Sequence, residues 1–195
     1  ITADGEATSQ EITNLMLQSS LADSLGRILD KDVIVDGQLA TRLSLFIPIT
    51  NGSQTRAKGE VYLNGNSLSI PAIDLDFSDT DGVVSFDNEK IEVRGLKASL
   101  LGQAVKVDLN TEQLDEAYNL FTSISGDWEA AKLAQFISDD LAALFVGSSN
   151  WKMDVNLDLM ANDFKYSAEL TTDLIGVNAN LPYPLMKENQ EKLKS

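Results

Sequence analysis

The segment Val61-Tyr62-Leu63-Asn64-Gly65-Asn66 opens the stretch, residues 61–109, that decides the fold. The stretch continues with Leu68-Ser69-Ile70, Gly82-Val83-Val84-Ser85-Phe86 and Ala104-Val105-Lys106-Val107-Asp108-Leu109, and an apolar residue stands at nearly every second position. Side chains of a β-strand point alternately to opposite faces, so the pattern predicts short strands, joined by tight polar turns, in a sheet with one apolar face. That face must be covered by the protein's own helices, by a partner or by a lipid.

Composition excludes several classes of function. The 195 residues carry a formal net charge of −15, which disfavours nucleic acid as a partner and leaves no polybasic patch for a membrane. The chain has no cysteine and no histidine, so it cannot form a disulfide, a thiolate or histidine zinc site, a Ser-His-Asp triad or a Cys-His pair. Apparent carboxylate pairs are expected by chance among 30 acidic residues. We therefore expect neither an enzyme nor a bound cofactor or metal.

No segment approaches the roughly 20 apolar residues that span a bilayer. The chain begins at Ile1 without an initiating methionine or a signal peptide, and it ends in the polar residues 187–195. We therefore expect a piece of a longer protein whose address or anchor lies outside this sequence.

Apolar residues at helical spacing predict three helices. The first covers residues 8–29 and begins with Thr8 and Glu11 at capping-box spacing. The second covers residues 111–125 and is expected to end at Gly126. The third is predicted from Asp127 to about Val146, where Gly147 ends it. Its apolar stripe consists of Ala130, Leu133, Ile137, Leu141 and Leu144.

Period-two alternation predicts strands before and after these helices. Residues 33–49 place Leu39, Thr41, Leu43, Leu45, Ile47 and Ile49 on one face. Pro48 cannot donate to a ladder, so the far end of that strand is expected at an edge. Residues 151–159 place Trp151, Met153, Val155, Leu157 and Leu159 on one face and Lys152, Asp154, Asn156 and Asp158 on the other. Residues 164–170 are predicted to form a hairpin with them, and residues 174–181 form a last strand.

Together the elements predict an α+β fold, with a large curved antiparallel β-sheet and about three helices packed on its apolar face. No low-complexity linker divides the chain, so we interpret residues 1–195 as a single domain. Within it we expect an N-terminal helix in residues 1–32, a strand-rich part in 33–110, a helical pair in 111–146, and a C-terminal β-hairpin with further strand in 147–185.

Several motifs resemble those of the AsmA-like proteins. Phe86-Asp87-Asn88, followed by Leu100-Leu101-Gly102-Gln103-Ala104-Val105, is similar to an element of that family, with Ala104 where proline is usual. The closing signature of the YhdP branch resembles Gly147-Ser148-Ser149-Asn150-Trp151, Leu170-Thr171-Thr172-Asp173-Leu174-Ile175-Gly176 and Leu181-Pro182-Tyr183-Pro184-Leu185-Met186-Lys187. The motifs lie within residues 86–187, and residues 1–60 match the family only in general character.

The resemblance implies a large protein anchored in the inner membrane of Gram-negative bacteria, with this chain as a periplasmic piece of it. The family, with its relative TamB, is similar to bridge-like lipid-transfer proteins, whose long curled sheet carries phospholipid acyl chains towards the outer membrane. The implied partners are phospholipid and neighbouring segments of the same long protein. The resemblance supplies no catalytic residues. The alternative is a non-enzymatic scaffolding domain that binds another envelope protein through an exposed strand edge.

The lipid-groove candidates are apolar residues of the two clearest strands, because an acyl chain needs a continuous apolar surface. They are Leu43, Leu45, Met153, Val155, Leu157 and Leu159. The alternative is that these faces form an ordinary core against the predicted helices.

A second candidate is a cluster of acidic residues, Asp74, Asp76, Asp79 and Asp81, which resembles a Ca²⁺ loop in composition. Its spacing does not fit an EF-hand, because the ligand series and the terminal glutamate are missing. We therefore interpret Asp74 and Asp76 as the polar face of a strand and residues 79–82 as a turn.

Overall fold

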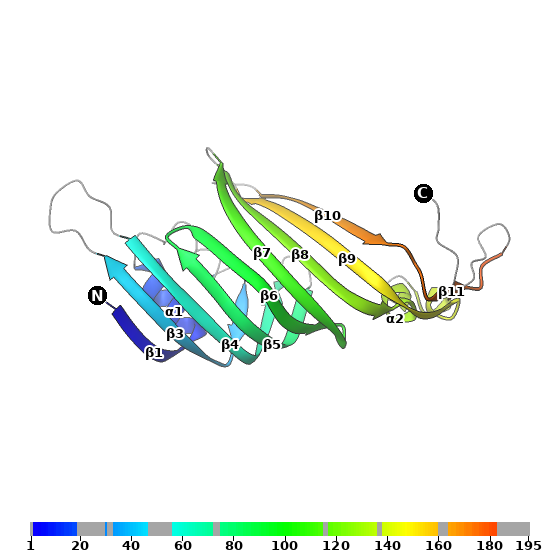
Figure 1. The fold of residues 1–195 in the computed structure, drawn as a ribbon, viewed down its shortest axis with the longest axis horizontal. Helices are drawn as coiled ribbons and strands as arrows, with labels where there is room; N and C mark the ends of the chain where they lie inside the picture. Colours follow the sequence, from blue (N-terminus) through cyan, green and yellow to red (C-terminus); the bar gives the residue numbers. More distant parts are fainter. Residues whose placement is uncertain are drawn as a thin grey trace.

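The computed structural model describes residues 2–18, 30, 33–46, 56–71, 75–114, 117–135, 138–159 and 164–182. In this part of the chain one 11-stranded sheet contains almost all of the structure, and its main path runs in the order β1-β3-β4-β5-β6-β7-β8-β9-β10 (Figure 1). Every pairing along this path is antiparallel, and the sheet is open, with β1 and β10 at its two ends. The large antiparallel sheet expected from the sequence is confirmed.

The strands on the main path are β1 (Thr2–Thr8), β3 (Gln38–Phe46), β4 (Arg56–Ile70), β5 (Leu75–Asp87), β6 (Lys90–Leu100), β7 (Gln103–Leu114), β8 (Ala117–Glu129), β9 (Phe145–Leu159) and β10 (Phe164–Thr172). Two short strands pair beside it: β2 (Ile34–Asp36) with β4, and β11 (Val177–Ala179) with β9. The described helices are α1 (Ser9–Leu17), α2 (Ala130–Gln135) and α3 (Asp139–Ala142). None of them is long and apolar enough to cross a membrane.

The apolar side chains of the sheet gather on one face. Leu63, Phe86, Val93, Val107 and Ile124 are buried in a single cluster. Their neighbours along the strands, such as Asn64, Asp87, Arg94 and Asp108, are exposed. The alternation of residues 61–109 therefore yields the apolar and polar faces that it predicted.

β-Bulges interrupt the ladders of three consecutive strands. The register shifts in β4 between Leu63 and Asn66, in β5 between Ser78 and Asp81, and in β6 between Val93 and Leu96. Each interruption contains a residue with positive φ, namely Gly65 (69°), Asp79 (49°) and Gly95 (62°). A bulge bends its strand and increases the local twist. Residues 79–82, which were predicted as a turn, and Asn64-Gly65-Asn66 are therefore bent points within long strands.

Near these bulges, side chains form hydrogen bonds with backbone N–H and C=O groups. The side-chain amide of Asn66 donates to the carbonyls of Asp36 (2.9 Å) and Gln38 (3.1 Å), so it ties the end of β2 to β4. The carboxylate of Asp108 accepts from the N–H of Gly95 at 2.7 Å, and that of Asp81 accepts from the N–H of Gly65 at 3.2 Å. Asp81 therefore has a structural role in the sheet.

The N-terminal region begins with a strand that the sequence did not predict. Residues 1–32 were expected to be helical, yet Thr2 to Thr8 pair with β3 from Ser44 to Gln38. The predicted capping box is confirmed: the Glu11 carboxylate accepts from the Thr8 N–H at 2.8 Å, and the Thr8 hydroxyl accepts from the Glu11 N–H at 3.3 Å. The hydrogen bonds that the Glu11 carboxylate accepts from the N–H and from the hydroxyl of Thr8 lower the pKa of Glu11. Residues 19–29 of the predicted helix and Ile47, Pro48 and Ile49 of the predicted strand lie outside the described residues.

The predicted helical pair in residues 111–146 is wrong for most of its length. Residues 111–114 belong to β7, and residues 117–129 form β8, which pairs with both β7 and β9. Among the described residues of this stretch, helical structure is limited to α2 and α3, of which α2 buries Ala130 and Ala134 while α3 buries none of its residues. The expected stripe is broken, because Ile137 lies outside the described residues and Leu141 and Leu144 are only half-buried. The backbone hydrogen bonds that β8 forms with β7 and β9 outweigh the preference for a helix that the spacing of apolar residues in 111–125 suggested.

The C-terminal hairpin is confirmed. Trp151 pairs with Thr172 and the register continues without a break to Leu159 opposite Phe164. However, β9 already begins at Phe145, so Gly147 lies inside a strand and does not end a helix. The last strand, β11, is shorter than the predicted residues 174–181 and pairs with the beginning of β9.

Candidate functional site

An apolar groove lies on the buried face of the sheet. It encloses a cavity of about 280 Å³, and only Ser9, Thr80 and Thr122 among its lining residues are polar. Its walls come from α1, from β2 and from the strands between β3 and β9. The groove thus crosses many strands, from the helix near one end of the sheet towards β9.

Helix α1 covers the groove near the β1 end of the sheet. Ile12 and Met16 are buried, belong to the main apolar cluster and line the cavity. In Figure 1 this helix lies behind β3 and β4. The capping box at Thr8 fixes where the helix begins, so Ile12 and Met16, one turn apart, face the sheet together.

Two of the six candidates proposed from the sequence, Val155 and Leu157, line the groove. Leu43 and Met153 are half-buried and pack against the same apolar cluster. Leu45 and Leu159 lie in β3 and β9, and their side chains are outside the described part of the structure.

Sequence reasoning missed most of the groove lining. Val61, Leu63, Phe86 and Val107 line the cavity. They stand in the alternating stretch 61–109 that predicted the sheet, so their signal was present in the sequence. These residues were not among the predicted lipid-groove candidates, because the alternation of apolar and polar residues is clearest in the two strands from which the candidates came.

The apolar face continues beyond the groove to the last strand. Tyr166 and Leu170 of β10 pair with Leu157 and Met153 of β9, so they share the apolar face. Leu170 is 50% exposed, and Tyr166 is 62% exposed. The apolar face is therefore covered by α1 near β1 and reaches solvent at β10.

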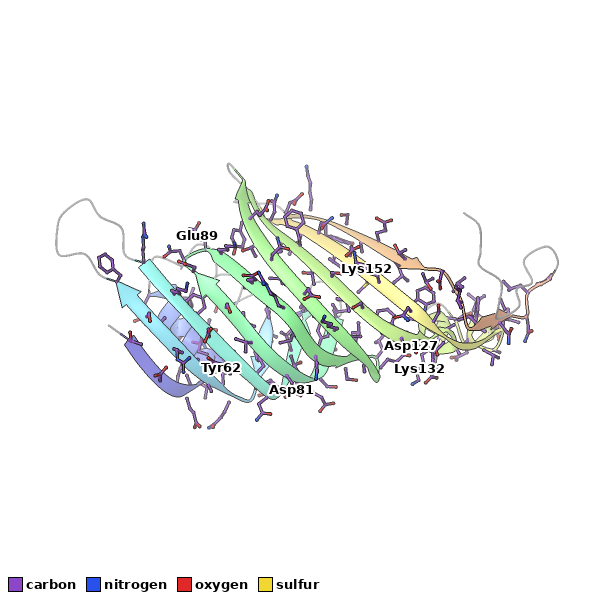
Figure 2. The ribbon with its side chains drawn as sticks, in the orientation of Figure 1. Tyr62, Asp81, Glu89, Asp127, Lys132 and Lys152 are labelled. Atoms are coloured by element: carbon purple, nitrogen blue, oxygen red, sulfur yellow. The ribbon has the colours of Figure 1, made fainter. Side chains whose placement is uncertain are left out.

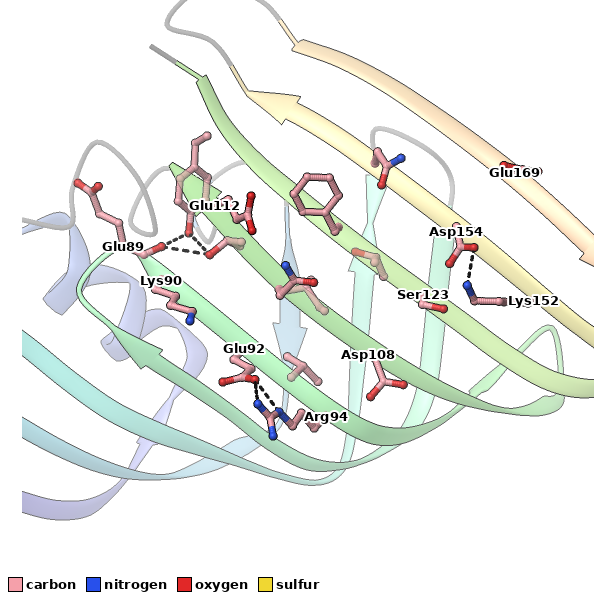
Figure 3. Close-up of a pocket in the computed structure, with 18 residues that line it drawn as sticks. Glu89, Lys90, Glu92, Arg94, Asp108, Glu112, Ser123, Lys152, Asp154 and Glu169 are labelled. Carbon is pink, nitrogen blue, oxygen red and sulfur yellow. Dashed lines mark hydrogen bonds and ion pairs between the residues drawn. The ribbon is translucent and has the colours of Figure 1, made fainter. Parts of the chain in front are cut away.

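The opposite face of the sheet carries a polar basin. Figure 2 shows the polar side chains along the sheet, including Tyr62 on β4 and Lys152 on β9. The basin, of about 1140 Å³, lies over the strands from β6 to β10 and contains carboxylates of Glu92, Asp108 and Asp154 (Figure 3).

Two of the three basic groups that line the basin have acidic partners. Lys152 Nζ lies 2.7 Å from a carboxylate oxygen of Asp154, and Arg94 pairs with Glu92 (Figure 3). The hydrogen bond from Lys152 is the main cause that lowers the pKa of Asp154. Such exposed pairs stabilise little. Within the described ranges, no cluster of three or more acidic side chains is placed to hold a metal ion.

One rim of the basin is fixed by a buried tyrosine. The Tyr118 hydroxyl donates to the Glu89 carbonyl and lies 3.1 Å from the Thr111 hydroxyl, which in turn accepts from the Ile91 N–H at 2.7 Å. Burial is the main cause that raises the pKa of Tyr118. These contacts tie the turn between β5 and β6 to β7 and β8.

The chain matches a known protein family over almost its whole length. The family model described as YhdP protein matches residues 1–194. The chain belongs to the YhdP family. The resemblance of its motifs to the YhdP branch is thereby confirmed.

One curated relative within the YhdP family is the intermembrane phospholipid transporter YhdP of Escherichia coli (strain K12), which is 34% identical over 197 residues. The match covers 99% of this chain and 15% of the relative, so the chain spans about one seventh of that protein's length. No solved structure matches the chain.

The YhdP-like motifs form tight backbone contacts outside the groove. Gly147 has φ of 107°, and a Cβ built on it would lie 2.1 Å from the carbonyl oxygen of Gly176. The Ser149 hydroxyl donates to Asp173 at 3.3 Å, and Asp173 accepts from the N–H of Ile175 at 3.0 Å. This motif therefore fixes the corner at which β10 returns to pair β11 with β9.

The other motif elements also hold turns. Asn88, with φ of 51°, accepts from the Ala57 N–H at 3.0 Å through its side chain. Leu101 and Gly102 form the turn between β6 and β7 with positive φ, and the Gln103 side chain accepts from the Glu129 N–H at 2.6 Å. We conclude that these signature residues maintain the shape of the sheet that forms the groove.

Proposed function

We propose that this chain is one segment of a conduit that carries phospholipid between the inner and outer membranes of the Gram-negative envelope. The observation that carries the proposal is the groove of about 280 Å³, lined almost entirely by apolar side chains and continuous with the exposed apolar face of β10. The name of the E. coli relative, an intermembrane phospholipid transporter, supports the same function.

The groove suits acyl chains on physical grounds. Each CH₂ group that leaves water for an apolar surface contributes roughly 0.8 kcal/mol, and the apolar walls need no specific contacts to provide it. A charged headgroup stays in water at the open side of the groove, because burying it without partners is costly. A surface of this kind holds chains without fixing one position, which allows movement along it.

Within this proposal the six apolar candidates contact acyl chains. They are Leu43, Leu45, Met153, Val155, Leu157 and Leu159, joined by the groove residues of α1 and of β4 to β8. Helix α1 covers this face near β1, and neighbouring segments of the same long protein continue the apolar face beyond this chain. The segment lies in the periplasm, its parent is anchored in the inner membrane outside this chain, and it works without a catalytic step, a metal or a cofactor.

Site-specific photo-crosslinking in cells tests the function. A photoreactive residue at Val155 or Leu157 is expected to capture phospholipid, because both side chains line the groove. The matched control is Asn156, which lies between them on β9 and lines the basin on the opposite face. Equal capture at Asn156 and its neighbours, or no capture at any of the three positions, would contradict the proposal.

A second candidate function is scaffolding through a strand edge. Among the described strands, β10 pairs only with β9, and residues 165–171 are all exposed. An edge of this kind accepts a further strand from a partner. A crosslinker at Ser167 that captures a protein, with no lipid captured at Val155, would favour this function over lipid transfer.

A further inference from the structure

Two of the buried hydrogen-bond donors without acceptors on the apolar face are indole N–H groups. The chain has two tryptophans, Trp128 and Trp151, and both indole Nε1 atoms are buried with no hydrogen-bond partner among the described residues. Trp128 is 3% exposed and belongs to the main apolar cluster, and Trp151 packs against that cluster. An indole N–H can only donate, so an acceptor oxygen is needed to complete each group.

The two tryptophans stand on neighbouring strands beyond the end of the groove. On β8 and β9, Ile124 pairs with Met153 and the next pair on the same face is Gly126 with Trp151. Trp128 follows Gly126 on that face, and its Nε1 lies 2.3 Å from where a Cβ on Gly126 would be. Since Ile124 and Val155 line the groove, the donors stand where the apolar wall ends.

Buried polar groups are almost always paired in native proteins, and an unpaired one calls for an explanation. A ligand that brings an acceptor to this position would remove the cost of the two unmade hydrogen bonds. The acceptor would be reached from the groove, because the same strands β8 and β9 form both.

We propose that the indole N–H groups of Trp128 and Trp151 donate to the ester carbonyl oxygens of a lipid whose acyl chain lies in the groove. The inference rests on the proposed function and names the part of the lipid that this segment recognises. An ester places its carbonyl next to the acyl chain, as the position of the indoles at the end of the groove requires.

The chemistry of the surroundings favours a carbonyl over a phosphate oxygen. A neutral acceptor suits an apolar wall, whereas a buried anion without a cation is strongly disfavoured. The basic residues of α2 and β9 are already paired, Lys132 with Glu129 at 3.0 Å and Lys152 with Asp154 at 2.7 Å. The net charge of −15 further disfavours an anionic group there.

The test compares three probes with the 195-residue chain in detergent solution. They are dioleoyl phosphatidylethanolamine, its di-ether counterpart with the same chains and headgroup, and dioleoylglycerol, which keeps the esters without the phosphate. Binding is measured by native mass spectrometry, and the emission of the two tryptophans gives a second readout. Both ester probes are expected to bind about tenfold more tightly than the ether, as a hydrogen bond to a buried donor implies.

The variants Trp128→Phe and Trp151→Phe keep a ring but remove the donor. Each is expected to weaken binding of the ester probes and to leave ether binding unchanged, so the ratio of the two affinities reports the hydrogen bond even where stability changes. Equal wild-type affinity for ester and ether, or equal losses for both in the variants, would overturn the inference while the conduit remains. Failure of every lipid to bind would overturn the proposed function and this inference with it.

Discussion

At the residue scale, backbone geometry explains why particular residues occupy the motifs. Gly147 and Gly176 have φ of 107° and 94°, and each faces a carbonyl of the opposing strand, Gly176 O and Ser148 O. No other residue type fits such a contact, because a Cβ would overlap the oxygen. Both glycines belong to motifs that are recognisable in the sequence, but their contacts could not be predicted from it, since these contacts join segments that are distant along the chain.

Gly147→Ala is expected to destabilise the chain by several kcal/mol, because the new Cβ would lie 2.1 Å from the Gly176 oxygen. The matched control is Gly102→Ala, whose Cβ would meet nothing within 4 Å. Gly102 has a φ of 69°. Gly102→Ala should therefore lower the free energy of unfolding by only about 1–2 kcal/mol, which is the cost of the left-handed conformation. Denaturant unfolding of both variants measures the difference, and similar losses would show that the corner is not tightly packed.

A second prediction concerns Tyr118. Its pKa is raised above the ordinary value of 10.0, chiefly by burial, so the folded state holds the phenol proton more tightly than the unfolded state does. The stabilising contribution is present below about pH 10 and is lost as the pH rises through the folded pKa.

At neutral pH the free energy of unfolding of Tyr118→Phe is expected to be about 1 kcal/mol lower than that of the wild type, because the variant lacks the hydrogen bond to the Glu89 carbonyl. Its free energy of unfolding should then fall less steeply than that of the wild type as the pH rises above 10.0. Urea unfolding at neutral and alkaline pH measures both effects. Parallel pH profiles would show that Tyr118 does not ionise from a buried position.

At the element scale, the sequence predicted the strands well and the helices poorly. The hairpin of β9 and β10 and the alternating β4 to β7 could be predicted because each strand follows the period-two pattern over many residues. The predicted helix in residues 111–125 rested on the helical spacing of Leu114, Ala117, Tyr118, Phe121 and Ile124. In β8, however, Phe121 and Ile124 lie on opposite faces. Ile124 is 1% exposed in the core, whereas Phe121 lines the polar basin. Single aromatic residues on a polar face make the two periods indistinguishable in a short segment.

Helix α1 gives an element-scale prediction. Ile12 is 8% exposed and lines the groove, so Ile12→Asp would place a carboxylate against apolar walls and should release the helix at a cost of several kcal/mol. The control Asn14→Asp changes an exposed position of the same helix and should have little effect. Amide hydrogen exchange of residues 9–17 measures the opening, and unchanged exchange in Ile12→Asp would mean that α1 does not depend on its contact with the groove.

At the scale of the whole molecule, the two faces of one sheet have different tasks. The polar face holds paired charges of a chain with net charge −15, which keeps that side hydrated. The apolar face encloses the groove and reaches solvent at β10. The sequence predicted that the apolar face needs a cover. It could not predict that α1 covers the face near β1 while Tyr166 and Leu170 of β10 are exposed, because the position of α1 depends on contacts between distant segments.

Filling the groove is expected to block lipid without unfolding the sheet. Val155→Trp would extend a large side chain into the cavity, at a cost of no more than about 1–3 kcal/mol for added bulk. We expect the amount of phospholipid that copurifies with the chain to fall sharply. Asn156→Trp adds the same bulk on the opposite face and should leave the lipid content unchanged. Equal lipid content in the two variants would show that the groove near β9 is not occupied.

The bulges of β4, β5 and β6 also change which residues of each strand face the apolar side of the sheet. Inward-facing residues of β4 are odd-numbered up to Leu63 and even-numbered from Asn66, and the same change of parity follows Asp79 in β5 and Gly95 in β6. Each bulge therefore shifts the alternation of inward-facing and outward-facing residues by one position. Deleting one residue there would turn every later side chain of the strand to the other face. Among relatives of this chain, length changes in these strands should consequently be even-numbered or occur in compensating pairs.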